Sequence, residues 1–307
     1  MDTRKEEAYI SRYTLRNRYL FEGRLVMQTA LHIGGGKVTL SNSDSPVILT
    51  PEEIPFIPGS SFKGALRSTV EKLVPGLPGL RTCGLIELSE EALKEERARN
   101  KAIPICSTVR QGEISEKLRH AQTVQQRETI RKETLRDLCH TCQLFGSPSA
   151  ASRITVSDLY MPASEWNGII QRRDGVAIDR DSEKAKDRLK YDFEVVPASA
   201  VFQLSITLEN ATPQDLQLVC VGLSEFVHGF GVIGGKRSRG LGICRLNELK
   251  VSELKLQKLT DEEEDISEDE KNRRLRDFLL HRKFPVEKVP GEQFLAQHIE
   301  TIFGEVA

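Results

Sequence analysis

Hydrophobic and polar residues alternate in two separate segments, and each alternation predicts a strand with one buried face. In residues 20–33 the positions expected to face the core are Phe21, Leu25, Met27, Leu31 and Ile33, and those expected to face outward are Glu22, Arg24, Gln28 and His32. In residues 201–209 the inward positions are Phe202, Leu204, Ile206 and Leu208. Two more strands are expected at residues 152–161 and 241–254.

Apolar residues spaced three or four apart predict two helices between these strands. The first follows Pro58-Gly59 and ends at Pro75-Gly76, and Ser60 or Ser61 is expected to cap it. Its apolar face is Phe62, Leu66, Val70 and Leu73. The second spans residues 214–230, with Leu216, Val219, Leu223, Phe226, Val227 and Phe230 inward. The order strand, helix, strand, strand, helix, strand is the ferredoxin-like arrangement, so we expect an α+β fold with a palm similar to an RNA-recognition motif. Many functions share this fold, so it decides none of them.

Two charged segments interrupt this pattern, and a third follows it. Residues 86–138 contain charged, helix-favouring stretches with little apolar periodicity, and we expect them to form an insertion over the core. Residues 165–195 contain a polar excursion, 171–190, that predicts a long hairpin or a mobile loop. We therefore expect a palm over residues 1–255 with these two insertions. An acidic linker and a charged C-terminal helix are expected at 256–307.

The composition is that of a globular protein with a heavily charged surface, since 38% of the 307 residues are hydrophobic and 29% are charged. No apolar run is long enough for a membrane span, and the first residues lack the apolar segment of a secretory signal, so a cytoplasmic protein without membrane contact is expected. The net charge is −1, but residues 260–271 hold eight acids and one lysine, which leaves +6 for the rest. This distribution is compatible with a polyanionic partner and also with an ordinary solvated surface. Of the six cysteines, Cys220 and Cys244 fall in apolar periodic segments and are expected in the core.

The other four cysteines suggest a metal site. Cys139 and Cys142 form a C-x-x-C pair, and Cys83 and Cys106 lie upstream around a charged segment. Four thiolates can bind a structural Zn²⁺ tetrahedrally, with His140 as an alternative to one cysteine, and the ion would tie together segments whose own cores are weak. Buried free thiols are the alternative. A redox pair is disfavoured because no βαβ pattern surrounds the motif.

Two glycine-rich loops resemble phosphate-binding loops at first sight. The sequences GGGK at 34–37 and GGK at 234–236 both lack the flanking residues of the Walker pattern. The second, which we call the basic glycine loop (residues 234–240), still offers backbone N–H groups and cations for sugar–phosphate contact. Its candidate RNA-binding residues are Gly234, Gly235, Lys236, Arg237 and Arg239. The alternative is an ordinary hairpin turn with solvated cations.

The start of the first helix is a second candidate for binding phosphate. Ser60 and Ser61 lie there, where unpaired N–H groups and the positive end of the helix dipole attract anions. Lys63 and Arg67 stand one turn apart, off the apolar face, so they could contact one phosphate track. The alternative is a capped helix with exposed cations. No strand carries the aromatic pattern for stacking bases, so any RNA would bind through loops and helix ends.

Three motifs together resemble the repeat-associated mysterious proteins (RAMPs) of CRISPR systems, and more narrowly the backbone subunit of type III effector complexes. They are LHIGGG with SDSPV and PFIPGSSFKGALRS, then CQLFGSPSAASRITVSDLY, and then GGKRSRGLG, within about residues 20–250. The resemblance implies a ferredoxin-like palm, stacking of copies along a guide RNA beside other type III subunits, and a thumb hairpin at 171–190 that interrupts the guide–target duplex. It also implies that the Pro-Gly-Ser-Ser helix and the basic glycine loop hold the guide backbone, and that Asp44 is needed to cut target RNA. The long charged region 86–138 and the acidic segment depart from the family pattern and leave the subtype open.

Two functions follow from this resemblance. In the first, the chain is a metal-dependent endoribonuclease subunit, a hydrolase of antiviral defence, in which Asp44 binds Mg²⁺ or another divalent cation, or acts as a base toward the RNA 2′-OH. In the second, the chain is a non-catalytic guide-RNA scaffold, and Asp44 is a turn residue that hydrogen-bonds its own backbone. A zinc hydrolase is disfavoured because four cysteines would close the coordination sphere. Asp44 favours the first function, and its metal role is favoured because no histidine lies near it in the sequence.

Overall fold

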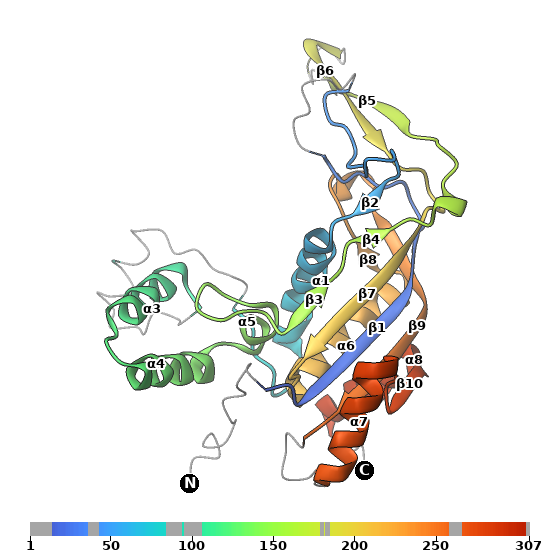
Figure 1. Cartoon of the computed structure of the whole chain (residues 1–307). Coiled ribbons are helices and arrows are strands. Elements are labelled where there is room, and N and C mark those ends of the chain that lie inside the picture. The colour runs from blue at the N-terminus through green and yellow to red at the C-terminus, as the bar shows by residue number, and fades with distance from the viewer. Residues whose placement is uncertain are drawn as a thin grey trace.

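A six-stranded antiparallel sheet forms the centre of the protein (Figure 1). In the computed structural model, which describes residues 14–35, 43–83, 94, 106–178, 181, 185–257 and 266–304, the strand order is β10-β9-β1-β7-β3, and β8 pairs with β9. The strands are β1 (Asn17–Met27), β3 (Ile154–Val156), β7 (Val201–Glu209), β8 (Gly231–Val232), β9 (Ile243–Lys255) and β10 (Val286–Pro290). Strand β1 pairs with both β7 and β9, so the two predicted amphipathic strands are direct neighbours.

Helices α1 (Gly59–Leu73), α6 (Pro213–Val227) and α8 (Gly291–Phe303) pack against one face of this sheet. Phe62 of α1 and Phe226 of α6 lie with their ring centroids 5.0 Å apart. The two helices approach closely at Gly222, where a Cβ atom would lie 2.7 Å from Cδ1 of Leu66. Replacing one of these buried aromatic rings by alanine would cost about 3–5 kcal/mol. The mixed α/β core therefore depends on the contact between helices as well as on the contact with the sheet.

The alternation at residues 201–209 is confirmed, because β7 covers that range and buries all four predicted residues. The alternation at residues 20–33 is confirmed in part. Its five predicted core residues are buried, but β1 ends at Met27, and Leu31 pairs with Val196 only as an isolated bridge. Since the chain no longer follows the sheet there, His32, predicted to face outward, is only 6% exposed.

The strand predicted at residues 152–161 divides into two short strands in different sheets. Strand β3 pairs with β7, whereas β4 (Leu159–Tyr160) pairs with β2 (Phe56–Ile57) just before α1. The division falls at Ser157 and Asp158, although the N–H of Ser157 still donates to the carbonyl oxygen of Ser205 in β7 at 3.1 Å. The buried residues of both strands, Ile154 and Leu159, still pack into the same core.

Asp158 explains why the chain turns at this point. Its Oδ1 accepts a hydrogen bond of 2.8 Å from the N–H of Gly59, the first residue of α1. The predicted cap from Ser60 or Ser61 is wrong, because Pro58 occupies the N-cap position and makes no side-chain cap bond. A residue far away in sequence thus satisfies the first donor of the helix.

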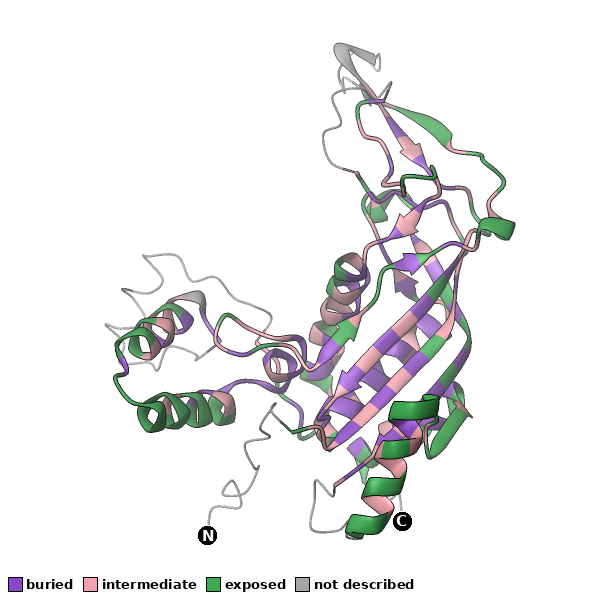
Figure 2. Cartoon of the chain, in the orientation of Figure 1, coloured by how far each residue is buried: buried purple, intermediate pink, exposed green. Residues whose placement is uncertain are grey.

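The two inserted segments extend away from the sheet (Figure 1). Helices α3 (Thr108–His120), α4 (Val124–Asp137) and α5 (His140–Phe145) form the described part of the first, and the exposed surfaces of α3 and α4 in Figure 2 match their charged sequence. Positions 84–93 and 95–105 lie outside the described residues. Strands β5 (Gln171–Ile178) and β6 (Ala185–Val195) pair antiparallel, so the polar excursion at 171–190 is a hairpin and not a loop.

Residues 266–304 contain more structure than the single charged helix predicted there. Helix α7 (Glu268–His281) contains most of the predicted helix, but β10 then extends the sheet and α8 returns to the core. The ring centroid of Phe294 in α8 lies 6.1 Å from that of Tyr19 and 5.7 Å from that of Phe21. The last described helix therefore packs against the first strand. The predicted acidic linker falls largely on residues 258–265, which lie outside the described ranges.

Phe230 is exposed, contrary to the prediction, whereas Cys220 and Cys244 are buried as predicted. Phe230, expected to face inward, is 71% exposed because α6 ends at Val227 and the chain reverses at Gly229, whose φ is 83°. Cys220 and Cys244 are fully buried, as predicted. Within the described residues, the structure contains no helix with the length and apolar character that crossing a membrane requires.

Candidate functional site

The base of the β5–β6 hairpin is where two of the predicted site segments meet. Successive residues of a strand point to opposite sides, and each side of β6 contacts a different loop. Asp192 and Glu194 bond to the loop that carries Asp44, which we call the Asp44 loop (residues 43–58). Tyr191 and Phe193 contact the basic glycine loop. Strand β6 therefore holds both loops, one through carboxylates and the other through aromatic rings.

Asp44 and Asp192 exchange hydrogen bonds between their backbones and their carboxylates. The N–H of Asp44 donates to Oδ1 of Asp192 at 2.8 Å, and the N–H of Asp192 donates to Oδ2 of Asp44 at 3.0 Å. The hydroxyl of Ser43 also donates to Oδ1 of Asp192, at 3.0 Å. Arg172 lies 3.6 Å from Oδ2 of Asp192 and offsets part of its charge. Because a carboxylate offers about four acceptor sites, the exposed Asp44 keeps capacity for a further ligand.

Glu194 holds the next part of the Asp44 loop and orients a histidine. Its Oε2 accepts from the N–H of Val47 at 3.0 Å, and its own N–H donates to the carbonyl oxygen of Ser45 at 3.0 Å. Its carbonyl oxygen lies 2.7 Å from Nδ1 of His32, whose ring meets that of Phe193 edge-on. A carbonyl only accepts, so Nδ1 is the donor and Nε2 is the acceptor of the neutral imidazole. The available sequence signal for His32 was the glycine run that begins two residues after it, at Gly34.

The cations of the basic glycine loop hold it against β6. Nζ of Lys236 lies 4.5 Å from the ring centroid of Phe193. The guanidinium of Arg239 lies 5.5 Å from the ring centroid of Tyr191 and donates to its hydroxyl. Nε of Arg237 donates to a carbonyl oxygen of the same loop at 3.0 Å. Each exposed cation–π contact contributes about 0.5–1 kcal/mol, so the loop is ordered while most of it stays exposed to solvent.

Gly234 and Gly235 let this loop approach the backbone of His32. Gly234 has a φ of 84°, and a Cβ atom there would lie 2.5 Å from the carbonyl oxygen of His32. The N–H of Gly235 donates to the same oxygen at 2.8 Å. One of the backbone donors predicted to contact phosphate is therefore already bonded inside the protein.

The start of α1 presents its serines and directs its cations toward the protein. Ser60 is exposed and Ser61 is partly buried. Nζ of Lys63 donates to Oγ of Ser152 at 2.7 Å and to a backbone carbonyl at 3.1 Å. Arg67 donates from Nε to Glu71 at 2.8 Å and from Nη1 to a backbone carbonyl at 3.0 Å. Within the described residues, the hydrogen bonds of Asp44 run to β6 and not to this helix.

The four predicted metal-ligating cysteines come together beside α1. The sulfur atoms of Cys83, Cys106, Cys139 and Cys142 all lie within 4.8 Å of one another, and three of the residues are buried. The N–H groups of Cys139 and Cys142 donate to Sγ of Cys106 and Cys139, each at 3.4 Å. His140 lies outside this set, and its Nδ1 accepts a bond of 3.1 Å from a backbone N–H. The cluster can therefore hold a metal ion with four sulfur ligands and no histidine.

The proximity of these thiols governs their protonation. The hydrogen bond with Cys139 lowers the pKa of Cys106, whereas the bond with Cys106 raises the pKa of Cys139 and also that of Cys142. One thiolate forms readily, and its charge opposes the ionisation of its neighbours. Four thiolates at this distance need a compensating cation, which a divalent metal ion supplies.

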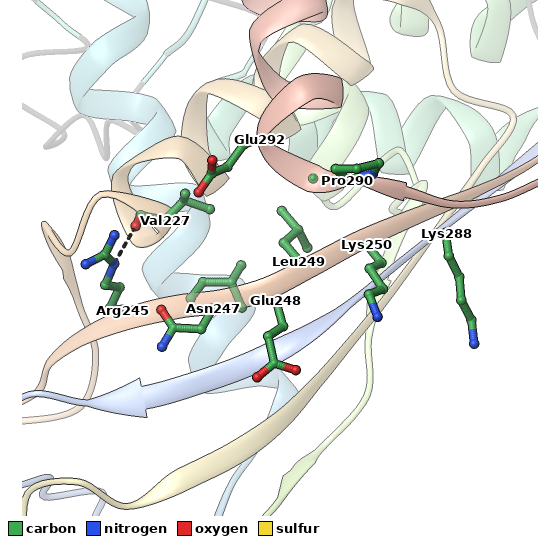
Figure 3. A pocket seen from close by; sticks show the side chains of 11 residues that line it. Val227, Arg245, Asn247, Glu248, Leu249, Lys250, Lys288, Pro290 and Glu292 are labelled. Carbon is green, nitrogen blue, oxygen red and sulfur yellow. Dashed lines mark hydrogen bonds between the residues drawn. The ribbon is translucent and has the colours of Figure 1, made fainter.

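A cavity of about 470 Å³ lies elsewhere, between the middle of β9 and the start of α8 (Figure 3). Its lining mixes cations such as Lys250 and Lys288 with acids such as Glu248 and Glu292. Nε of Arg245 at its edge donates to a backbone carbonyl at 3.1 Å. The cavity therefore has no dominant charge, and the described residues that line it include none of the predicted site residues.

Comparison with known proteins gives one family. A family model described as the RAMP superfamily matches residues 24–245. The CRISPR system Cms endoribonuclease Csm3 of Methanocaldococcus jannaschii is 24% identical over 258 residues, which cover 78% of this chain and 82% of that protein. The residues matched by the family model include the four clustered cysteines, the Asp44 loop and the basic glycine loop.

Two further relatives carry the same name and match over shorter stretches. The protein of Methanothermobacter thermautotrophicus is 41% identical over 59 residues, which are 18% of this chain and 24% of that protein. The protein of Enterococcus italicus is 45% identical over 60 residues, which are 19% of this chain and 28% of that protein. Each of these two matches therefore covers less than a fifth of this chain.

Proposed function

Because this chain belongs to the RAMP superfamily, we propose that it is a guide-RNA-binding backbone subunit of a type III CRISPR effector complex and that it cleaves complementary target RNA. The relatives named CRISPR system Cms endoribonuclease Csm3 support this proposal, above all the one that matches 78% of the chain. In this proposal its partners are the guide CRISPR RNA, the target RNA, further copies of itself and other subunits of the complex. A guide-RNA complex of this kind serves antiviral defence in the cytoplasm, which is therefore the proposed compartment.

The strand order supports a ferredoxin-like palm. If β1, β3, β7 and β9 are the four strands of the β-α-β-β-α-β pattern and α1 and α6 are its helices, the first and third strands lie in the middle of the sheet and the second and fourth lie outside them. We propose that residues 1–255 form this palm, with the charged insertion at 86–138 and the β5–β6 hairpin within 165–195 as its thumb. Residues 256–307 then form an appended segment.

The proposed guide contacts are the first turn of α1 and the basic glycine loop. The first turn of α1 offers the positive end of the helix dipole and the exposed Ser60, and the basic glycine loop offers exposed cations, which suits phosphate and sugar contact without base reading. The residues are Ser60, Ser61, Lys63, Arg67, Gly234, Gly235, Lys236, Arg237 and Arg239. Lys63 and Arg67 also stabilise the protein itself, so the cations of the loop are the better targets for testing RNA contact.

The observation that carries the catalytic part is an exposed carboxylate, that of Asp44, with a fixed position. Two hydrogen bonds shared with Asp192 hold it at the base of the hairpin, where a target strand splayed by that hairpin would pass. Carboxylate oxygens are the donors that Mg²⁺ prefers, and the bound ion would stabilise the charge that develops on the phosphate. Without an ion, Asp44 would take the proton of the 2′-OH while the 2′-oxygen bonds to phosphorus and the bond to the 5′-oxygen breaks.

The test uses the complex assembled with guide RNA and partner subunits and incubated with complementary RNA. Asp44→Asn keeps a side-chain oxygen that can accept the Asp192 N–H but removes the charge, so the proposal expects normal guide and target binding without cutting. The matched control is Glu52→Gln, which neutralises an exposed acid of the same loop and should cut at the wild-type rate. A target with a 2′-deoxy sugar at the cut site should survive, and EDTA should stop the wild type if a metal ion is required.

The second candidate function, a non-catalytic scaffold, is favoured by the same pair of hydrogen bonds. They join the Asp44 loop to β6, and a purely structural Asp44 would need nothing else. This function predicts that Asp44→Asn behaves as wild type in every assay, and that no variant of Asp44 separates target binding from target cutting. Normal cutting by Asp44→Asn would therefore overturn the endoribonuclease proposal at this residue.

We also propose a structural Zn²⁺ in the cysteine cluster. Tetrahedral coordination at about 2.3 Å places sulfur atoms about 3.8 Å apart, and the four sulfur atoms, already within 4.8 Å of one another, reach that geometry with small side-chain rotations. Four sulfur ligands close the coordination sphere, so the ion would hold the insertion against α1 and would take no part in cutting.

A further inference from the structure

Asp192 accepts two hydrogen bonds from the start of the Asp44 loop and returns one to the Asp44 carboxylate. We propose that Asp192 is a positioning residue for Asp44: its carboxylate fixes the backbone of the loop and thereby holds the Asp44 carboxylate at the place where target RNA reacts. This inference rests on the proposed function of Asp44 and adds a residue that neither the motifs nor the relatives indicate.

The pair is reciprocal, and this is what gives Asp192 a positioning role. Oδ1 of Asp192 binds the N–H of Asp44 and the hydroxyl of Ser43, at 2.8 and 3.0 Å, so it holds the backbone on which the Asp44 side chain stands. The N–H of Asp192 binds Oδ2 of Asp44 at 3.0 Å, so it also holds the side chain itself. Asp192 alone therefore binds both the backbone N–H and the side-chain carboxylate of Asp44.

A carboxylate suits this task better than a neutral acceptor would. Hydrogen bonds to an ionised acceptor are about twice as strong as neutral ones, and Asp44 is otherwise exposed on a loop. Arg172, 3.6 Å from Oδ2 of Asp192, balances the charge that would otherwise repel the nearby Asp44. Because a misplacement of about 1 Å lowers a rate by about 10²-fold, loss of this contact should lower the cutting rate without removing a reacting group.

The experiment measures single-turnover cutting and target affinity in the assembled complex for Asp192→Ala and Asp192→Asn. Asp192→Ala should cut about 10²-fold more slowly while binding target as the wild type does. Asp192→Asn keeps an oxygen acceptor for the same two donors and should recover part of the rate, which a role of negative charge alone would not allow. Glu52→Ala, an exposed acid of the same loop, is the matched control and should cut normally.

Amide exchange of residues 43–47 gives a readout that does not depend on activity. Exchange at Asp44 should accelerate in Asp192→Ala and stay near the wild-type rate in Asp192→Asn. If Asp192→Ala fails to assemble, Ser43→Ala removes one of the two donors and should still slow cutting measurably. The positioning role is overturned if Asp44→Asn is inactive while Asp192→Ala and Ser43→Ala cut RNA and exchange their amides at wild-type rates. If Asp44→Asn cuts normally, the proposed function of Asp44 itself has failed.

Discussion

Nη2 of Arg67 donates a hydrogen bond to Sγ of Cys142 across 3.5 Å, and this contact joins the first helix of the core to the cysteine cluster. Arg67 was predicted as a phosphate ligand from its place one turn after Lys63. Its contacts with Cys142, Glu71 and a backbone carbonyl instead give it a role inside the protein. Contact between Arg67 and RNA stays a prediction, but the orientation of α1 depends on the same cysteines that are proposed to bind the metal.

The first prediction concerns metal content. Wild-type protein should contain about one zinc per chain, as a closed four-cysteine site requires, and Cys142→Ser should lose both the metal and part of the stability, measured by elemental analysis and thermal unfolding. The control is Cys220→Ser, in a fully buried core position away from the cluster, which should lower the stability without lowering the metal content. Metal-free wild-type protein with full stability would contradict the prediction.

The second prediction separates the two kinds of cysteine by their reactivity. Burial raises the pKa of Cys244 to about 12 and also raises that of Cys220, so neither forms a thiolate near neutral pH. Alkylation of folded, chelator-treated protein should therefore begin at Cys106, the cluster cysteine whose pKa is lowered, and should spare Cys220 and Cys244, as mapped by mass spectrometry. In untreated protein the metal should protect the cluster cysteines as well. Modification of Cys244 before unfolding would show that its environment is more open than the structure indicates.

The third prediction compares two glycines of the same helix. A Cβ atom at Gly59 would lie 2.2 Å from the carbonyl oxygen of Val156, whereas one at Gly64 would meet nothing within 4 Å. Gly59→Ala should therefore cost about 1–3 kcal/mol through overpacking, and it should loosen the contact between α1 and β3. Gly64→Ala should instead stabilise the protein by about 0.5–1 kcal/mol, because alanine favours a helix interior. Chemical denaturation of both variants checks the pair, and equal effects would contradict this account of α1.

The fourth prediction concerns the salt dependence of guide binding. Arg237→Ala and Arg239→Ala each remove a cation of the basic glycine loop, so each should weaken guide binding at low salt with little dependence on guide sequence. If one phosphate contact is lost, the slope of log K against log salt should fall by about 0.7 for single-stranded RNA. Lys117→Ala, an exposed cation on α3, is the control. Unchanged slopes in both loop variants would move the guide-binding surface elsewhere.

The sequence predicted the fold well where one face of an element meets water and the other meets the core. Residues 201–209 alternate in that way and form β7 with the predicted residues inside. The pattern failed where a residue serves a distant partner. Asp158 interrupts a strand to bond the first residue of α1, and no local pattern reveals such a contact. The last strand and helix were missed although α8 carries the apolar residues Phe294, Leu295 and Ile302, because the partners of these residues lie far away in the chain.

The sequence was enough to predict which residue types form the candidate site, but not which residues contact one another in it. The C-x-x-C pair and two further cysteines predicted the cluster, which the structure assembles without His140. Asp44 came from motif resemblance, but its partner Asp192 lies 148 residues away and has no signature of its own. His32 was assigned to the wrong side because the alternation was extended beyond the end of β1. Spacing in sequence therefore indicated which chemistry is present, whereas the tertiary fold decides which groups meet.

The packing of α8 on β1 has a consequence for how this protein is made. The rings of Phe294 and Phe21 touch although they stand more than 270 residues apart in the chain. At a synthesis rate of about 5–20 residues per second, β1 leaves the ribosome well over ten seconds before the helix that covers Phe21. The apolar surface that α8 covers, which includes Phe21, stays uncovered during that delay and is a site where the unfinished chain can aggregate.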